Sequence, residues 1–167
     1  MSPYYFMPDE IRKSVYDIDL HLLYSKGFRC ILVDLDNTLM PWNDVSISDE
    51  VKRWFARAER IGFKAVIVSN NDSKRIEPIA KAAGVPFLPH AGKPMKKAAI
   101  KAMEIAGASR KQTVLIGDQL LTDIWTGKRA RIYTVLVSPI NTAEFKWTRF
   151  TRLFERAILS SMGVKRP

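Results

Sequence analysis

The chain has 167 residues, with 27 lysines and arginines against 17 aspartates and glutamates, so its formal net charge is +10. This length fits one domain, a hydrophobic content of 47% excludes general disorder, and a single cysteine excludes a disulfide framework and cysteine-rich zinc modules. Because the sequence shows neither a signal-peptide pattern nor an apolar run near the ~20 residues that span a bilayer, we expect a cytoplasmic protein whose positive charge favours an anionic partner.

Short apolar runs alternate with helical patterns along the chain. The runs cover residues 30–33, 65–68, 85–88 (the weakest), 113–116 and 133–137. The helical patterns cover residues 48–61, 72–83, 94–107 and 121–130. Continuous apolar runs of this length are typical of strands that are buried on both faces of a parallel sheet. The alternation therefore predicts an α/β fold, a Rossmann-like doubly wound parallel sheet with right-handed crossovers.

We expect a single domain over residues 1–167. Its core would cover about 29–137, with a helical preface over 1–28 and a helical tail over 141–167. Sheets of this kind bind ligands at the carboxyl ends of their strands, where the strand order reverses. The polar residues that follow each apolar run are therefore the candidates for chemistry.

The first run is followed by two aspartates, Asp34 and Asp36. Side chains two residues apart on an extended strand point the same way, so both carboxylates can share one side of a site. One carboxylate can attack phosphorus and form an aspartyl-phosphate, and the other can give a proton to the leaving oxygen and take one from water. Two acidic residues in a solvated turn are the alternative, and this pattern alone favours neither.

The second run is followed by Ser69, Asn70 and Asn71, at the start of a predicted helix. A hydroxyl and backbone N–H groups at such a point can hold a phosphate. Serine and asparagine are also common helix caps, and capping is the better explanation of this segment taken alone.

Two further segments carry candidate residues. Lys93 lies between a glycine and a proline, where its ammonium can neutralise phosphoryl oxygens and hold a nucleophile ionised, although most lysines are merely solvated. Asp118 and Asp123 follow the run over 113–116. Their carboxylates can complete an oxygen-only Mg²⁺ site with the first aspartate pair, or can stabilise a helix N-terminus instead.

The order and spacing of these segments favour a function. Asp34 precedes Ser69 by 35 residues, Ser69 precedes Lys93 by 24, and Lys93 precedes Asp118 by 25. The first and last intervals are each near the length of one βα unit, and every segment falls where this fold binds ligands. Four unrelated structural roles would have to coincide to give this arrangement.

Taken together, these residues resemble the haloacid dehalogenase superfamily of phosphatases. The resemblance spans about residues 29–137 and rests on four motifs: residues 33–39, residues 66–71, Lys93, and Gly117-Asp118 with Asp123 in the G-D-x-x-x-x-D form. It implies a Mg²⁺-dependent phosphomonoester hydrolase that acts through an aspartyl-phosphate.

The resemblance also implies a role for each motif residue. Asp34 would be the nucleophile and Asp36 the general acid/base. Mg²⁺ would be held by Asp34, by the main-chain carbonyl of Asp36 and by Asp118. Asp123 would support Lys93 and the water shell of the metal.

By the same resemblance, Ser69, the amides around Asn70, and Lys93 would hold the phosphoryl group. Members of the superfamily insert cap domains after the first motif or between the second and third. The corresponding segments here, 39–64 and 72–92, have no room for a cap. We therefore expect an open, capless site, as in class IIIA members, which suits a bulky or surface-presented phosphate.

Within that class the chain is most similar to the YqeG-type subfamily. The similarity lies in residues 5–9, 36–39, 92–94 and 117–123, and in the total length. That subfamily is similar to eukaryotic phosphatidylglycerophosphate phosphatases, which make phosphatidylglycerol. The implied partner is a phosphorylated substrate, either this lipid or a soluble sugar phosphate, a nucleotide or a nucleic-acid end.

Two other functions compete with this interpretation. A nucleic-acid-binding module would use the charge of +10, but the basic residues are scattered and no nucleic-acid-binding motif is present, so nucleic acid is not the expected partner. A receiver domain also uses aspartates, a lysine and Mg²⁺, but it keeps its acidic pair on a separate strand from the phosphorylated residue. Nothing in the sequence indicates an oligomeric state.

The tail is predicted to form an amphipathic helix. Residues 141–167 carry six basic side chains against two acidic ones. One helical face would hold the apolar residues Phe150, Leu153, Phe154, Ala157 and Ile158, flanked by Arg149, Arg152 and Arg156. We expect this helix to pack on the sheet. The alternative is that it also makes peripheral contact with an anionic membrane, at its inner face.

Overall fold

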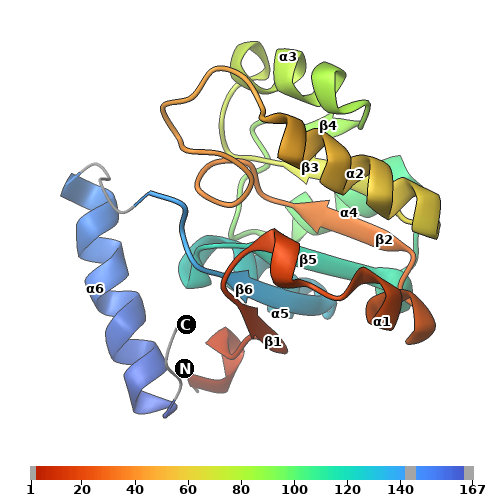
Figure 1. The fold of residues 1–167 in the computed structure, drawn as a ribbon. Helices are drawn as coiled ribbons and strands as arrows, with labels where there is room; N and C mark the ends of the chain where they lie inside the picture. Colours follow the sequence, from red (N-terminus) through yellow and green to blue (C-terminus); the bar gives the residue numbers. More distant parts are fainter. Residues whose placement is uncertain (1–2, 142–145, 164–167) are drawn as a thin grey trace.

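The protein is described by a computed structural model over residues 3–141 and 146–163. Its centre is a six-stranded sheet in which every pairing is parallel, in the order β1-β6-β5-β2-β3-β4 (Figure 1). The strands are β1 (Glu10–Arg12), β2 (Cys30–Val33), β3 (Lys64–Val68), β4 (Phe87–Leu88), β5 (Thr113–Gly117) and β6 (Tyr133–Val137). The predicted Rossmann-like parallel sheet is confirmed.

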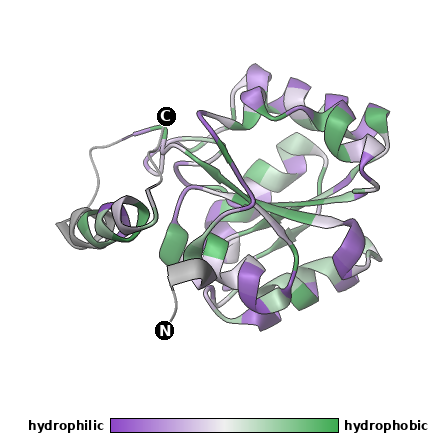
Figure 2. Cartoon of the chain, turned by 90° about the horizontal axis from the view of Figure 1, so that it is seen from below, coloured by the Kyte–Doolittle hydropathy of each residue, from purple (hydrophilic) through white to green (hydrophobic). Residues whose placement is uncertain are grey.

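Helices cover both faces of this sheet. One face carries α1 (Leu20–Ser25), α2 (Asp49–Ile61) and α3 (Ser73–Ala83), and the other carries α4 (Lys96–Ala106) and α5 (Trp125–Ala130). Side chains alternate along β2, since Ile31 and Val33 belong to the core under α2 while Cys30 and Leu32 belong to the core under α4. Figure 2 shows the result, apolar strands enclosed between helices with hydrophilic outer faces.

Local signals fix the helix ends close to where they were expected. Ser48 caps α2 by accepting a hydrogen bond from the Val51 amide, and Asp72 caps α3 by accepting one from the Arg75 amide. The helix expected over 121–130 is divided into a π-helical turn, η4 (Leu120–Ile124), and α5. Short 3₁₀ turns complete the chain: η1 (Pro3–Phe6), η2 (Val15–Asp17) and η3 (Arg110–Gln112).

The preface differs from its expected helical form because it also contains β1. This strand pairs with β6, with Glu10 opposite Val135 and Arg12 opposite Val137. β1 is three residues long, and two of them are charged, so it has no apolar run to reveal it. Short, charged strands are typical of sheet edges, where they discourage pairing with another chain.

The tail forms α6 (Lys146–Ser161), which lies beside the β1 edge of the sheet (Figure 1). Leu159 is buried against η4 and the end of β6. The prediction of a single packed apolar face is wrong for Leu153 and Phe154, which are 65% and 61% exposed. The buried face instead includes Glu155, which accepts a hydrogen bond from the Leu121 amide, so the helix is rotated toward η4. The side chains of Arg149, Phe150 and Arg152 lie outside the described residues.

The strand order places the candidate site. From β2 the chain continues to β3 and β4 on one side, while β5 and β6 lie on the other side. The loops after β2 and β5 therefore leave adjacent strands in opposite directions, and ligands bind at such a point. Between β2 and β3 the chain holds one helix, and between β3 and Lys93 it holds a helix and a two-residue strand, so no cap domain stands over this edge. Within the described residues, no helix has the length and apolar content to cross a bilayer.

Candidate active site

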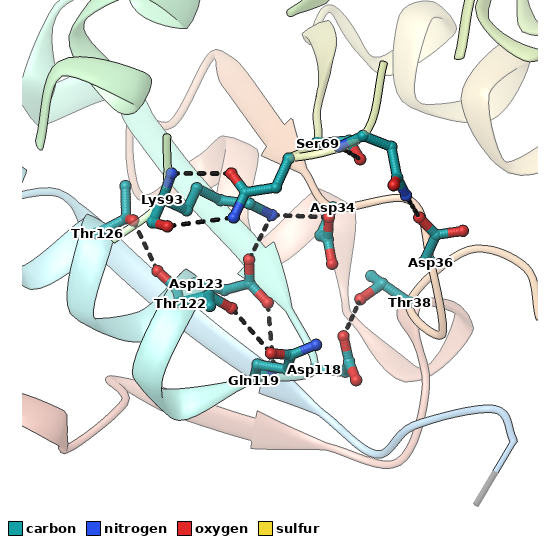
Figure 3. A network of polar contacts seen from close by, with 12 residues as sticks. Asp34, Asp36, Thr38, Ser69, Lys93, Asp118, Gln119, Thr122, Asp123 and Thr126 are labelled. Carbon is teal, nitrogen blue, oxygen red and sulfur yellow. Dashed lines mark hydrogen bonds and ion pairs between the residues drawn. The ribbon is translucent and has the colours of Figure 1, made fainter. Parts of the chain in front are cut away.

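The residues that the motifs singled out come together at one edge of the sheet. Asp34 follows β2, Ser69 follows β3 and Asp118 follows β5, while Lys93 comes from the loop after β4 (Figure 3). The Asp34 amide donates to the Ile116 carbonyl at 2.9 Å, so strand pairing continues one residue beyond β2 and fixes where Asp34 leaves the sheet.

Four charged side chains form an inner group: Asp34, Lys93, Asp118 and Asp123. All four are buried. The Lys93 ammonium lies 2.7 Å from a carboxylate oxygen of Asp34 and 2.7 Å from one of Asp123. Carboxylate oxygens of Asp34, Asp118 and Asp123 all lie within 4.8 Å of one another. The ammonium thus pairs with two of the three clustered carboxylates, and the side chain of Asp34 keeps 10% of its surface exposed.

The pKa values in the inner group follow from this imbalance. Burial raises the pKa of Asp34 well above its usual value, the Asp123 and Asp118 carboxylates add to the increase, and the Lys93 ammonium opposes it. Burial by itself lowers the pKa of Lys93, but the carboxylates of Asp123 and Asp34 outweigh it and raise that pKa above its usual range. Lys93 is therefore firmly cationic, and its single charge does not compensate the surrounding carboxylates.

The inner group fits a divalent cation such as Mg²⁺. Its donors are carboxylate oxygens, which hard cations prefer, and with its carboxylates ionised it carries two more negative than positive charges. A buried excess of this size is costly without a counter-ion. Asp34 and Asp118, the carboxylates expected to hold the metal, are both in this cluster, and Asp123 joins them while contacting Lys93.

The loop after β2 is shaped by Asn37, whose φ of 60° lies in the left-handed region that asparagine tolerates better than most residues. This bend directs Thr38 toward β5, where its hydroxyl donates to an Asp118 oxygen at 3.0 Å. The D-x-D-x-T pattern marked Thr38 only as part of a motif. The structure shows that it contacts the Asp118 carboxylate (Figure 3).

Gly117, just before Asp118, allows Asp123 its close approach. A Cβ atom at position 117 would lie 2.3 Å from the carboxylate carbon of Asp123, so no larger residue fits. Asp123 is fixed further by the Gln119 amide, which donates to it at 3.1 Å across η4. The glycine and the spacing to Asp123 are therefore a packing requirement of the inner group.

Asn70 holds Lys93 in place from the neighbouring loop. The Lys93 amide donates to the Asn70 side-chain oxygen at 2.8 Å, and the Asn70 side-chain amide donates to the Lys93 carbonyl at 3.1 Å. This pairing occupies both the oxygen and the amide group of the Asn70 side chain. Ser69 is buried beside it, and its hydroxyl accepts from the Asn71 amide at 3.2 Å.

Asp36 lies in a second set of contacts, the rim group, which consists of Asp36, Asn71 and Arg75. The Asn71 side-chain amide donates to one Asp36 oxygen. The Arg75 guanidinium donates to the other through Nη2 and through Nε, the latter at 3.1 Å. Sequence reasoning missed Arg75. The available signal was its place in the first turn of a helix that begins at the second motif.

The comparisons with known proteins agree with this geometry. The family model of haloacid dehalogenase-like hydrolases matches residues 21–131. A probable phosphatase of Bacillus subtilis, YqeG, is 37% identical over 96% of this chain and 94% of its own length. The chain belongs to the haloacid dehalogenase-like hydrolases. Its expected place among the YqeG-type phosphatases of that superfamily is confirmed.

Two further proteins are similar to this chain at lower identity. The chloroplastic phosphatidylglycerophosphate phosphatase 1 of Chlamydomonas reinhardtii is 28% identical over 82% of this chain, which spans about half of that protein (54%). A crystal structure of 3-deoxy-D-manno-octulosonate 8-phosphate phosphatase from Moraxella catarrhalis, with magnesium, phosphate and the sugar bound, has a TM-score of 0.54 at 14% identity, covering 84% of this chain and 90% of that one. This second likeness shows the shared fold.

Proposed function

We propose that the protein is a Mg²⁺-dependent phosphomonoester hydrolase that acts through an aspartyl-phosphate on Asp34. The observation that carries the proposal is the buried contact of Lys93 with both Asp34 and Asp123, beside Asp118. A buried positive charge beside the Asp34 carboxylate suits a nucleophile that must approach an anionic phosphoryl group.

The reaction would proceed in two displacements. In the first, a carboxylate oxygen of Asp34 forms a bond to phosphorus, the bond from phosphorus to the substrate oxygen breaks, and Asp36 gives its proton to that oxygen. In the second, Asp36 takes a proton from water as the water oxygen attacks phosphorus, which releases phosphate and restores the Asp34 carboxylate. Bound by Asp34, Asp118 and the Asp36 carbonyl, Mg²⁺ would supply positive charge next to the phosphoryl oxygens.

The neighbouring residues would orient the phosphoryl group. Ser69 and the main-chain N–H of Asn70 lie where β3 turns toward α3, and Lys93 faces the same space (Figure 3). Because Asn70 fixes the Lys93 backbone on both sides, the ammonium needs little reorganisation when charge develops.

Phosphatidylglycerophosphate is the substrate that we propose. Support comes from the relatives named for that activity and from the site, over which no cap domain stands. The exposed Leu153 and Phe154, with Arg156 one turn further along α6, support peripheral contact with an anionic membrane. This contact would bring a lipid headgroup to the carboxyl edge of the sheet.

Phosphate release by the purified protein tests this function. We expect Mg²⁺-dependent release that is abolished by a chelator, and faster release from phosphatidylglycerophosphate than from sugar phosphates or nucleotides. Asp34→Asn should be inactive, while Asp49→Asn, which changes an exposed aspartate at the start of α2, should match the wild type. An active Asp34→Asn protein would refute the covalent route, and a preference for soluble phosphates would refute the lipid substrate.

A further inference from the structure

Arg75 connects the candidate general acid/base to a second part of the chain. Besides its two contacts with Asp36, its guanidinium donates through Nη1 to the main-chain carbonyl of Asp44 at 2.9 Å. The Arg75 side chain is 22% exposed, so a substrate can reach it. Asp36 thus contacts a guanidinium that is held by the Asp44 carbonyl and is partly exposed to solvent.

These contacts conflict with the role proposed for Asp36. A general acid must turn one carboxylate oxygen toward the leaving oxygen of the substrate. In this structure one oxygen accepts from Asn71 and the other accepts from Arg75. Two guanidinium N–H groups fill the oxygen that faces Arg75, so the transferable proton belongs on the oxygen that faces Asn71. A protonated Asp36 loses its charge and binds the guanidinium less strongly, so Arg75 is then better served by another anion.

We propose, resting on the phosphatase function above, that Arg75 selects substrates that carry a second phosphate close to the phosphomonoester. That second phosphate replaces Asp36 on the guanidinium and frees the Asp36 carboxyl to face the leaving oxygen. Two guanidinium N–H groups of Arg75 donate to a single Asp36 oxygen, and a phosphate oxygen can accept the same pair, so the second phosphate would take the place of Asp36.

The chemistry of the inner group leaves this task to Arg75. The Lys93 ammonium is held between Asp34 and Asp123, where it would face the phosphoryl group to be transferred. Arg75 belongs to the rim group, where its guanidinium contacts Asp36, the residue that would protonate the leaving oxygen. Phosphatidylglycerophosphate carries a phosphodiester on the same glycerol as its phosphomonoester, whereas a simple sugar phosphate or glycerol phosphate has no second phosphate.

Two soluble substrates whose leaving oxygen is a primary hydroxyl of glycerol test the proposal. These are glycerol 3-phosphate and the deacylated headgroup, glycerophosphoglycerol phosphate, which adds the diester without a lipid chain. We expect the wild type to favour the headgroup in kcat/KM. Arg75→Gln should lower that preference tenfold or more, mainly through the KM for the headgroup, and Arg75→Lys should retain part of it. Lys74→Gln removes a charge from the exposed neighbour in the same helical turn and should keep the full preference.

The outcomes separate the two proposals. Equal losses on both substrates in Arg75→Gln would make Arg75 a support for Asp36 alone and would overturn its selective role, as would a wild type with no preference. If Arg75→Gln does not fold, the comparison of Arg75→Lys with Lys74→Gln decides. A wild type that releases no phosphate from either substrate with Mg²⁺ refutes the phosphatase function itself.

Discussion

The inner group and the rim group place two aspartates, only two residues apart, in opposite surroundings. Asp34 shares a buried ammonium with a second carboxylate, and Asp36 meets a guanidinium and an amide where its side chain is 19% exposed. In the interior, unbalanced charge is costly and raises the pKa of Asp34, whereas at the rim water screens the same interactions. The inner group therefore favours the binding of a cation, whereas in the rim group the hydrogen-bond partners of Asp36 can be exchanged.

Activity should separate the two aspartates most strongly. With Mg²⁺ and an alkyl phosphate, Asp34→Asn removes the nucleophile and should lower kcat by several orders of magnitude. Asp36→Asn removes proton transfer and should cost about 10²–10⁴-fold. In kcat/KM, which reports the first displacement alone, the Asp36→Asn loss should shrink with p-nitrophenyl phosphate, whose leaving group needs little protonation, and the Asp34→Asn loss should not. Similar losses for both variants on both substrates would contradict the assigned roles.

Lysine and arginine should differ in their effect on stability. Lys93→Met leaves the buried carboxylates of Asp34 and Asp123 without their shared counter-ion, so without metal the free energy of unfolding should fall by about 3–5 kcal/mol. Arg75→Met opens a partly exposed pair and should cost about 1 kcal/mol or less. Urea unfolding in the presence of a chelator measures both. Equal losses of unfolding free energy in the two variants would mean that water screens the inner group as much as it screens the rim group.

Much of this arrangement could be predicted from the sequence, because the strands at its centre are continuous apolar runs and the motifs of Asp34, Ser69 and Asp118 directly follow three of them. The positions of Asp34, Ser69 and Asp118 at one edge follow from parallel pairing alone. Arg75 could not be found in this way, since it lies within a helix and no short-range pattern shows which loop a long side chain reaches. The direction of its guanidinium depends on Asp36 and Asp44, which are 39 and 31 residues away.

The ends of the chain were less predictable for another reason. Periodicity showed an apolar face in the tail but not which part of that face meets the domain. That choice depends on the buried Glu155 and the η4 amide to which it bonds, a tertiary contact with no local signal. β1 was missed because a three-residue edge strand buries too little apolar surface to require an apolar run.

The pH dependence of stability should reveal the charge imbalance of the inner group. Because the pKa of Asp34 is raised in the folded protein, its contribution to stability is complete below the usual value of 3.8 and is lost as the pH rises through the folded pKa. Without metal, Asp34→Asn should therefore raise the melting temperature, and by more at pH 8 than at pH 5. Glu59→Gln, at an exposed site on α2, is the control. Mg²⁺ should stabilise the wild type more than Asp34→Asn, and a variant less stable than the wild type at pH 8 would argue against the imbalance.

The smallest expected effect lies outside both groups, on α6. Leu153→Ser with Phe154→Ser should leave the melting temperature nearly unchanged, because both side chains are exposed, whereas Leu159→Ala should lower it. If α6 contacts an anionic membrane, two partly inserted apolar side chains contribute on the order of 1–2 kcal/mol, and the double variant should bind phosphatidylglycerol vesicles about tenfold more weakly. Ile105→Ser, at an exposed apolar site on α4, should bind like the wild type. Co-sedimentation at low and high salt measures this, and equal recovery on neutral and anionic vesicles would exclude the membrane contact while leaving the chemistry of Asp34 and Asp36 untouched.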